Sequence, residues 1–393
     1  MILYGSLLCV LFSTVFLPKL PAHQAASPPR LLSIAKQVVK LPKLKEYGYY
    51  YQWQTEQDVL VWKDDPNDFK PGLIDVRSGA RDDLKAFNAR LVQMWPRGGH
   101  HIWLHTLRLS PDGKWVIWME GGIVSPPTRW GALSLDGSRF VSGDIGYYFG
   151  QPILLWLPDS RHFAALSDDP QALLIYSLDA PTRQQQIELP PFPSEWMPKV
   201  NFYLILIGFP SPGRALARIG GTDEEGVPNT GFYTFPIMER TGARHYIIPI
   251  PNGVQTNGLD ALELSPQGNR LAWCYRFFRE WDKGLSNRQE VWVSDVDGSH
   301  MHEVGFHESL YANPADRPVR ALKTPSFGPS DNRPADGKAR MLVEILSFRT
   351  GSEMTEIYGQ PATSHILDSF QWLSDGKRLS FLYDDAIWIV PVD

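Results

Sequence analysis

The fold is decided by the stretch Leu107-Arg-Leu-Ser-Pro-Asp-Gly-Lys-Trp-Val-Ile-Trp118, in which two alternating apolar runs flank Ser110-Pro-Asp-Gly113. Proline presets the first backbone angle of a turn, aspartate accepts hydrogen bonds from the backbone that follows it, and glycine tolerates a positive φ. The segment therefore predicts a β-hairpin closed by a tight turn.

The same hairpin pattern recurs along the 393-residue chain. Turn centres near residues 55, 111, 159, 212, 267, 331 and 375 lie about 44 to 64 residues apart, at or above the roughly 40–50 residues of one propeller blade. The copies near residues 55 and 331 are the least regular. A third apolar strand follows most hairpins, which is typical of a sheet that continues outward from the hairpin.

The two ends of the chain supply complementary pieces of one blade. Residues 185–190 and 245–251 have the character of fourth strands, and residues 37–42 resemble them although no hairpin precedes them. The last copy stops after a third strand at residues 387–393. Joining the ends would complete a four-stranded blade and remove exposed sheet edges. We therefore expect an all-β fold: a single β-propeller of four-stranded antiparallel blades over residues 27–393, closed by an N-terminal strand.

Seven blades is the preferred count. Six blades, with residues 309–365 as an insertion, is the alternative, because the copy near residue 331 is the least regular. The Ser-Pro-Asp-Gly hairpin followed by an aromatic strand resembles the WD-repeat-like propeller repeats of the TolB type. We expect neither the separate N-terminal domain of TolB nor a peptidase domain, and the sequence contains no G-x-S-x-G nucleophile elbow. The resemblance implies a fold and a style of binding, and it carries no activity.

The N-terminus predicts export. Residues 2–17 are almost entirely apolar, which is short for a membrane span of about 20 residues and typical of a signal peptide. We expect residues 1–26 to be a signal peptide, with an uncleaved membrane anchor as the alternative, and the protein to be periplasmic, in the cell envelope or extracellular. Cys274 is then the single cysteine, so no internal disulfide can form, and its apolar surroundings predict a buried thiol.

Composition and charge narrow the classes of partner. The chain is 43% hydrophobic with a net charge of −5 and a pI near 6.1, so it can build a core and shows no basic footprint for nucleic acid. We expect a monomer with no cofactor. The recurring turn aspartates have a mechanical role in the hairpins; these are Asp112, Asp136, Asp159, Asp297 and Asp375.

Histidines offer a weak metal site. His100 and His101 precede the second hairpin, while His300 and His302 alternate on an expected fourth strand, where they would share one face. Oligogalacturonate lyases resemble this architecture and use histidines around a divalent metal, but their motif is not matched here. A divalent metal is therefore the alternative to a protein without a cofactor.

The loops between second and third strands should gather on one rim, which is richer in acidic residues than the chain as a whole. This rim predicts a site for a basic protein partner, a carbohydrate or another ligand, or for Ca²⁺. Its candidate residues, which we call the acidic rim, are Asp64, Asp65, Trp130, Asp168, Asp169, Asp223, Glu224, Trp281 and Asp384.

The sequence favours an exported, non-catalytic propeller scaffold that binds a protein or other ligand through its loop rim or central channel. The alternative is a propeller enzyme acting on polysaccharide, a lyase or glycoside hydrolase, with carboxylates or a metal in the central funnel. An enzyme should bring titratable groups from several innermost strands into one pocket.

Overall fold

The structure is a computed structural model, and no helix among the residues that it describes is long and apolar enough to cross a membrane. It describes residues 29–42, 48–63, 69–94, 100–122, 127–145, 153–168, 171–190, 200–222, 231–237, 244–247, 259–281, 284–312 and 367–392. The expected signal peptide lies outside these residues.

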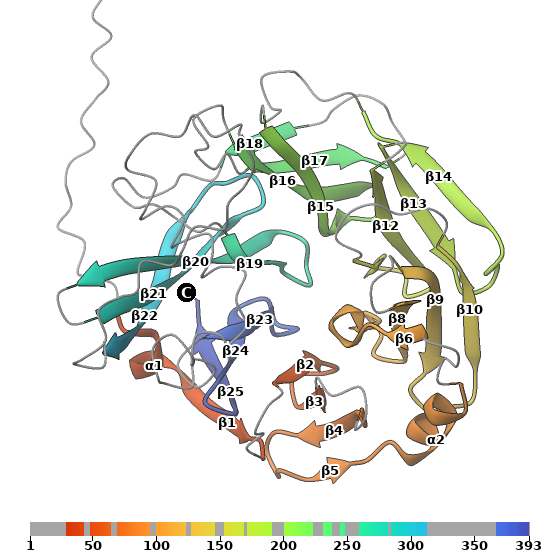
Figure 1. Ribbon diagram of the computed structural model, residues 1–393, viewed down its shortest axis with the longest axis horizontal. Helices are drawn as coiled ribbons and strands as arrows, with labels where there is room; N and C mark the ends of the chain where they lie inside the picture. The colour runs from red at the N-terminus through yellow and green to blue at the C-terminus, as the bar shows by residue number, and fades with distance from the viewer. Residues whose placement is uncertain are drawn as a thin grey trace, which may run out of the picture.

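The described strands form six antiparallel sheets arranged as blades around a centre (Figure 1). Blade 1 contains β2 (Tyr49–Trp53), β3 (Asp58–Lys63), β4 (Gly72–Asp75) and β5 (Arg81–Asp82). Blade 2 contains β6 (His100–Ile102), β7 (Arg108–Leu109), β8 (Trp115–Gly122), β9 (Pro127–Ser134) and β10 (Phe140–Asp144). Blade 3 contains β11 (Leu155–Trp156), β12 (His162–Asp168), β13 (Gln171–Ser177) and β14 (Gln184–Glu188).

Blade 4 contains β15 (Val200–Ser211), β16 (Arg214–Thr222), β17 (Gly231–Pro236) and β18 (Arg244–Ile247). Blade 5 contains β19 (Leu259–Leu264), β20 (Arg270–Trp281), β21 (Gly284–Asp295) and β22 (His302–Ala312). Blade 6 contains β23 (Asp368–Trp372), β24 (Arg378–Tyr383), β25 (Ala386–Pro391) and β1 (Lys36–Lys40). In blade 2 the innermost position is shared by β6 and β7, which both pair with β8 and are separated by the 3₁₀ turn Leu104–Thr106.

The ring closes as predicted, because β1 pairs antiparallel with β25 as the outermost strand of blade 6. Before β1, the chain also contacts blade 5: Phe306 donates its backbone N–H to Pro29 O at 3.1 Å, and the short helix α1 (Leu31–Ile34) buries Leu31 in the core between blades 5 and 6. The N-terminal segment therefore links two neighbouring blades.

Six hydrophobic cores, one between each pair of neighbouring blades, settle the blade count. Blades 5 and 6 share a core in which Cys274 and Val291 lie in one cluster with Phe370 and Trp372. The buried side chain of Gln289 also donates to Leu367 O and accepts from Leu367 N, both at 2.7 Å. No room is left for a blade between them, so the six-blade alternative is correct and the preference for seven was wrong. The repeat copy near residue 331 lies outside the described residues.

The hairpin turns are built as the sequence predicts. Ser110 Oγ donates to Asp112 Oδ1 at 2.6 Å, Lys114 N donates to the same carboxylate oxygen at 3.1 Å, and Gly113 has a φ of +69°. The other recurring turn aspartates also accept a hydrogen bond from the backbone N–H two residues further on, and these are Asp136, Asp159, Asp297 and Asp375. Their mechanical role is confirmed.

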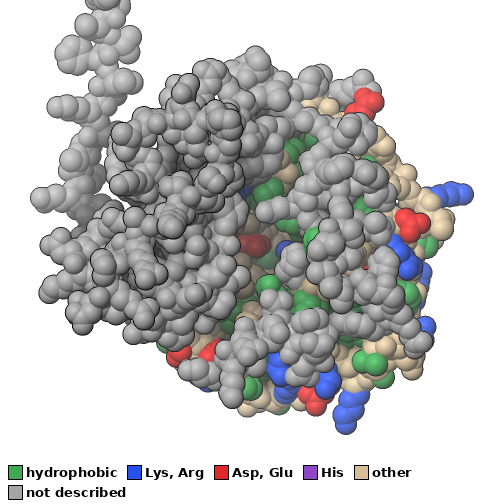
Figure 2. Space-filling model, viewed as in Figure 1, with side chains coloured by type: hydrophobic (Ala, Val, Ile, Leu, Met, Phe, Trp, Pro, Cys, Tyr) green, Lys and Arg blue, Asp and Glu red, His purple; other side chains and the backbone are tan. Residues whose placement is uncertain are grey.

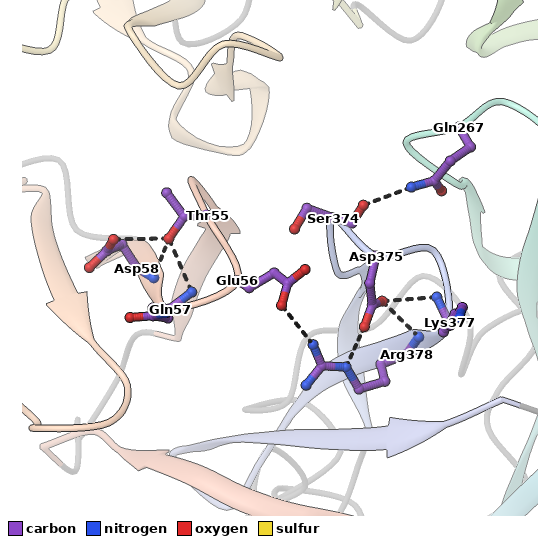
Figure 3. Close-up of polar contacts among 9 residues, drawn as sticks. All are labelled: Thr55, Glu56, Gln57, Asp58, Gln267, Ser374, Asp375, Lys377 and Arg378. Atoms are coloured by element: carbon purple, nitrogen blue, oxygen red, sulfur yellow. Dashed lines mark hydrogen bonds and ion pairs between the residues drawn. The ribbon is translucent and has the colours of Figure 1, made fainter.

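Turns of adjacent blades also bond to one another around the centre of the ring. Figure 3 shows Gln267 of blade 5 donating to Ser374 O of blade 6 at 2.7 Å, and Arg378 of blade 6 facing Glu56 of blade 1 at 3.4 Å. Because each blade is an antiparallel meander, its first and third turns lie on one face of the disc, which we call the hairpin-turn face. The loops between second and third strands lie on the opposite face.

The sequence predicted neither α1 nor a second, longer helix. Helix α2 (Lys85–Met94) lies between blades 1 and 2 and buries Phe87 and Leu91 in the core of those blades. The buried environment predicted for Cys274 is confirmed, since its thiol is in no disulfide and is fully enclosed.

Candidate functional site

The innermost strands line the middle of the ring, and one position on each of them defines a common level. This position lies five residues before the turn glycine in Leu107-Arg-Leu-Ser-Pro-Asp-Gly113 and in Leu262-Glu-Leu-Ser-Pro-Gln-Gly268. By the same alignment of the turns, the level consists of Gln52, Arg108, Leu155, Gly208, Glu263 and Gln371 in blades 1 to 6. We call these six residues the channel layer.

Strand pairing supports this alignment. Arg108 pairs with Ile117, and Glu263 pairs with Ala272, so both lie nine residues before their partners on the second strand. Residues at equivalent positions of a repeat stand at the same height, and blades 2 and 5 are three apart in a ring of six. Arg108 and Glu263 therefore lie at one level on opposite sides of the channel.

The two glutamines of the layer hold neighbouring blades together. Gln52 donates to Leu107 O at 3.0 Å and accepts from Leu109 N, so blade 1 forms hydrogen bonds with the backbone on both sides of Arg108. Gln371 donates to Tyr51 O in the same manner, from blade 6 to blade 1. These side chains serve the scaffold.

Arg108 and Glu263 differ from the glutamines because they interact electrostatically with each other across the channel. The two residues attract each other electrostatically although their strands belong to opposite blades, and Arg108 also donates from Nη1 to Leu107 O at 2.8 Å. Burial lowers the pKa of Arg108, and burial raises the pKa of Glu263 to about 7 against the opposing effect of Arg108. Figure 2 shows acidic and basic side chains in the hollow at the middle of the ring. We call Arg108 and Glu263 the channel pair.

The backbone at the channel pair is fixed by tryptophans of the following blades. Trp156 of blade 3 donates its indole N–H to Arg108 O at 3.0 Å, and Trp372 of blade 6 donates to Glu263 O at 3.1 Å. Each charged residue thus sits on a strand held from the next blade. Rigid support of this kind is what a preorganised binding site requires.

Two acidic-rim residues are described fully: the prediction is wrong for Trp130, whereas Asp384 is exposed in a loop of the predicted rim. Trp130 is entirely buried, with its ring centroid 4.8 Å from that of Phe163, so its interpretation as a rim anchor was wrong. The reason is its register on β9 opposite Met119, which turns the ring into the core between blades 2 and 3. Asp384 lies in the β24–β25 turn, and its carboxylate pairs with Lys40 Nζ at 3.2 Å. It therefore fastens the closing strand β1.

The rest of the acidic rim stays a prediction. Asp168 and Trp281 end strands β12 and β20, at the face predicted, but their side chains are not described. The remaining members lie outside the described residues: Asp64, Asp65, Asp169, Asp223 and Glu224.

The histidine arrangement differs from the expectation. His300 precedes β22 in a turn with a φ of +52°, and its Nδ1 pairs with Asp295 Oδ2 at 2.6 Å. His302 begins the strand, and its Nε2 lies 3.0 Å from Val392 O. The premise that His300 and His302 share a strand face was therefore wrong, because the chain turns between them.

His100 and His101 lie on β6, the innermost strand of blade 2, although their side chains are not described. Within the described part of the chain, no group of three or more histidine, cysteine, aspartate or glutamate side chains is placed to hold a metal ion. The expectation of a divalent metal stays untested for the loops beyond those residues.

A second hollow, of about 570 Å³, lies on the hairpin-turn face between blades 4 and 5. Its charged side chains are already engaged: Arg214 donates to Thr234 Oγ1 at 3.1 Å, and Asp295 pairs with His300. This hollow is a weaker candidate than the channel pair.

The class of protein follows from this architecture: the described strands form a six-bladed β-propeller built from repeated hairpins. No family model matches the chain, and no curated protein matches its sequence. Among solved structures, it is similar to an oligogalacturonate lyase in complex with manganese, with 10% identity, a TM-score of 0.46, and 91% of this chain and 96% of that chain covered. A structure described as TolB from Agrobacterium tumefaciens has 9% identity and a TM-score of 0.42, with 68% of this chain and 85% of that chain covered.

Proposed function

We propose that this protein is a non-catalytic binding propeller whose ligand is held in the central channel between Arg108 and Glu263. The observation that carries the proposal is the channel pair itself. Opposite charges occupy the same repeat position on opposite blades, and they attract each other electrostatically. A positive and a negative group held at one level on opposite sides of a channel can bind a ligand of complementary charge.

Binding fits the channel layer better than catalysis. General acid–base chemistry needs a group that gives up a proton and a second that accepts one. Arginine stays protonated, so Glu263 is the single proton-transfer group among the six members of the layer, whose others are glutamine, leucine and glycine. A charge pair without a second acid or base can orient a ligand and hold it.

The proposal is tested by thermal unfolding of the protein with a panel of small carboxylates, amines, amino acids and sugar acids. A compound that binds the native state alone raises the apparent stability, by about 2.7 kcal/mol at a hundredfold excess over its dissociation constant. We expect at least one compound to stabilise the wild type, and its effect to disappear in Arg108→Gln or Glu263→Gln.

Matched controls are available on blade 3. Arg183→Gln and Glu188→Gln make the same chemical changes at exposed positions around the outermost strand β14. These variants should keep the stabilisation seen in the wild type. Stabilisation that persists in both channel variants, or a panel without any stabilising compound, would place the ligand elsewhere and overturn the proposal.

A further inference from the structure

The hollow between blades 4 and 5 has the size of a ligand site and an unusually polar lining. Its volume of about 570 Å³ lies within the roughly 300–1,000 Å³ of small-molecule pockets. Such pockets are mostly apolar, whereas six of the eight described residues that line this hollow are polar or charged. A ligand for the hollow must therefore form many hydrogen bonds. The six residues are Ser211, Arg214 and Thr234 from blade 4, and Asn269, Asp295 and Asp297 from blade 5.

Thr234 brings a buried hydrogen-bond donor to the hollow. It is 4% exposed, and its Oγ1 accepts a hydrogen bond from Arg214 Nη2 at 3.1 Å. A guanidinium has no acceptor, so the proton of the Thr234 hydroxyl needs another partner, and no described residue accepts it. A buried donor without an acceptor costs free energy, and a ligand oxygen at this point would remove that cost.

The two carboxylates of the blade 5 wall each have one oxygen left for a ligand. Asp295 Oδ2 accepts from Ser299 Oγ at 3.2 Å, and Asp297 Oδ1 accepts from Ser299 N at 2.9 Å. Among the described residues, none donates to Asp295 Oδ1 or to Asp297 Oδ2. Asn269 Oδ1 accepts from Ser265 Oγ at 3.1 Å, while its Nδ2 donates to no residue of the described part. This wall thus offers a donor as well as two acceptors.

Hydroxyl groups match both walls, since each hydroxyl donates one hydrogen bond and accepts others. A carboxylate ligand would meet two like charges, Asp295 and Asp297, against the single cation Arg214, which already donates to Thr234. An ammonium group could accept nothing from Thr234 or Asn269. The hollow therefore favours a neutral ligand with several hydroxyl groups.

The remaining lining suits the carbon skeleton of such a ligand. Pro210 of blade 4 and Val296 of blade 5 are apolar and can contact C–H groups. The two walls are also held in place: a Cβ at Gly268 would lie 2.2 Å from Pro210 O, so the turns of the two blades are in close contact, and Val296 N donates to Asn269 O at 3.0 Å. A preorganised site of this kind loses less free energy to ordering when it binds.

We propose that this hollow is a binding site for a neutral sugar. The sugar hydroxyls accept hydrogen bonds from Thr234 and Asn269 and donate to Asp295 and Asp297, and its C–H groups contact the two apolar residues. The hollow shares no lining residue with the channel layer, so this inference goes beyond the proposed function and does not depend on it.

The test measures calorimetric affinities of the full-length protein for two sets of sugars. The neutral set is glucose, galactose, mannose and N-acetylglucosamine, and the charged set is glucuronate, galacturonate and glucosamine. We expect at least one neutral sugar to bind, and to bind about tenfold or more tightly than any charged one, because the uronates meet like charge and the ammonium group replaces a hydroxyl that can accept.

Variants locate the binding. Thr234→Val removes the hydroxyl at nearly constant shape and should weaken binding of the preferred sugar about fivefold or more, whereas Thr234→Ser keeps the hydroxyl and should retain binding. Asp297→Asn replaces an acceptor by a donor and should weaken binding to a similar extent. Its matched control is Asp136→Asn in the equivalent Asp-Gly-Ser turn of blade 2, where Ser138 N donates to Asp136 Oδ1 at 2.9 Å. This control should bind the sugar as the wild type does.

The inference is overturned if none of the four neutral sugars binds, or if a charged sugar binds as tightly as the best neutral one. It is also overturned if binding persists undiminished in both Thr234→Val and Asp297→Asn, or if Asp136→Asn loses as much affinity as Asp297→Asn. The comparison between sugars uses the wild type alone, so it remains decisive even if Thr234→Val does not fold.

Discussion

Glu303→Gln should stabilise the protein at neutral and alkaline pH, because Glu303 is a second carboxylate beside one arginine. On blade 5, Arg288 Nε lies 2.7 Å from Glu290 Oε1, while Arg288 Nη2 lies 4.0 Å from Glu303 Oε1. The Glu303 side chain is 15% exposed, and its Oε1 has no hydrogen-bond partner. The guanidinium also stacks over Phe306 at 3.9 Å, so its position is fixed in favour of Glu290.

The magnitude follows from proton linkage. Burial, and then repulsion from Glu290, raises the pKa of Glu303 from 4.5 to about 7. At about 1.4 kcal/mol for each pH unit, this difference sets an upper limit of about 3 kcal/mol, and residual contact with water reduces the expected value to about 1–2 kcal/mol. Since the folded state holds this proton more tightly than the unfolded state, the wild type loses stability as pH rises from about 4.5 to about 7.

Urea unfolding at constant ionic strength, from pH 4.5 to 8, measures this effect. Glu303→Gln cannot ionise, so its free energy of unfolding should match that of the wild type near pH 4.5 and exceed it increasingly up to pH 7 and above. Glu308→Gln, at an exposed position on the same strand, is the matched control and should follow the wild type throughout. A difference between Glu303→Gln and the wild type that is independent of pH would refute the reasoning.

Three further changes test the scaffold. Gly268→Val should destabilise by about 2 kcal/mol or more in urea unfolding, because Gly268 has a φ of +73° and a Cβ there would lie 2.2 Å from Pro210 O; Gly213→Ala, with nothing within 4 Å of its Cβ, should be nearly neutral. Asp385→Gly should increase the free energy of unfolding by about 0.5–1 kcal/mol and raise the melting temperature, because both residues of the β24–β25 turn, Asp384 and Asp385, have positive φ. A lower melting temperature would contradict this account. Deleting residues 31–42 removes β1 and should lower the melting temperature sharply, whereas an unchanged value would disprove closure by the N-terminal strand.

The turn chemistry made the fold predictable from sequence. Ser110-Pro-Asp-Gly113 determines a local structure almost alone, because its hydrogen bonds and its positive φ involve neighbouring residues. Closure was predictable as well, since the unpaired strand at residues 37–42 matches a missing fourth strand at the C-terminus. Both inferences depend on local or end-to-end patterns that the chain displays directly.

The blade count was not predictable, because spacing cannot distinguish a blade from an inserted segment. Strand β22 ends at Ala312 and β23 begins at Asp368, an interval long enough for a further blade. The packing of Cys274 and Val291 against Phe370 shows that blades 5 and 6 are neighbours. The spacing of the repeat turns along the sequence gives no information on contacts between residues so far apart.

Trp130 shows a similar limit for the predicted site. It follows a loop in sequence, so it suggested an exposed anchor, but pleating alternates side chains between the two sheet faces. Its register opposite Met119 places it in a core, and one residue of difference would have placed it on the other face. Sequence alone does not fix that register.

The channel pair was missed for a reason that connects site and blade count. The signal was present in Leu-Arg-Leu at residues 107–109 and Leu-Glu-Leu at residues 262–264, where a charge interrupts an apolar strand at one repeat position. In a ring of seven blades, no blade stands directly opposite another, so two such charges would not face each other. In a ring of six, copies three apart lie across the channel. Because the blade count is even, two charged residues at the same repeat position lie on opposite sides of the channel. The electrostatic attraction between Arg108 and Glu263 follows from this placement.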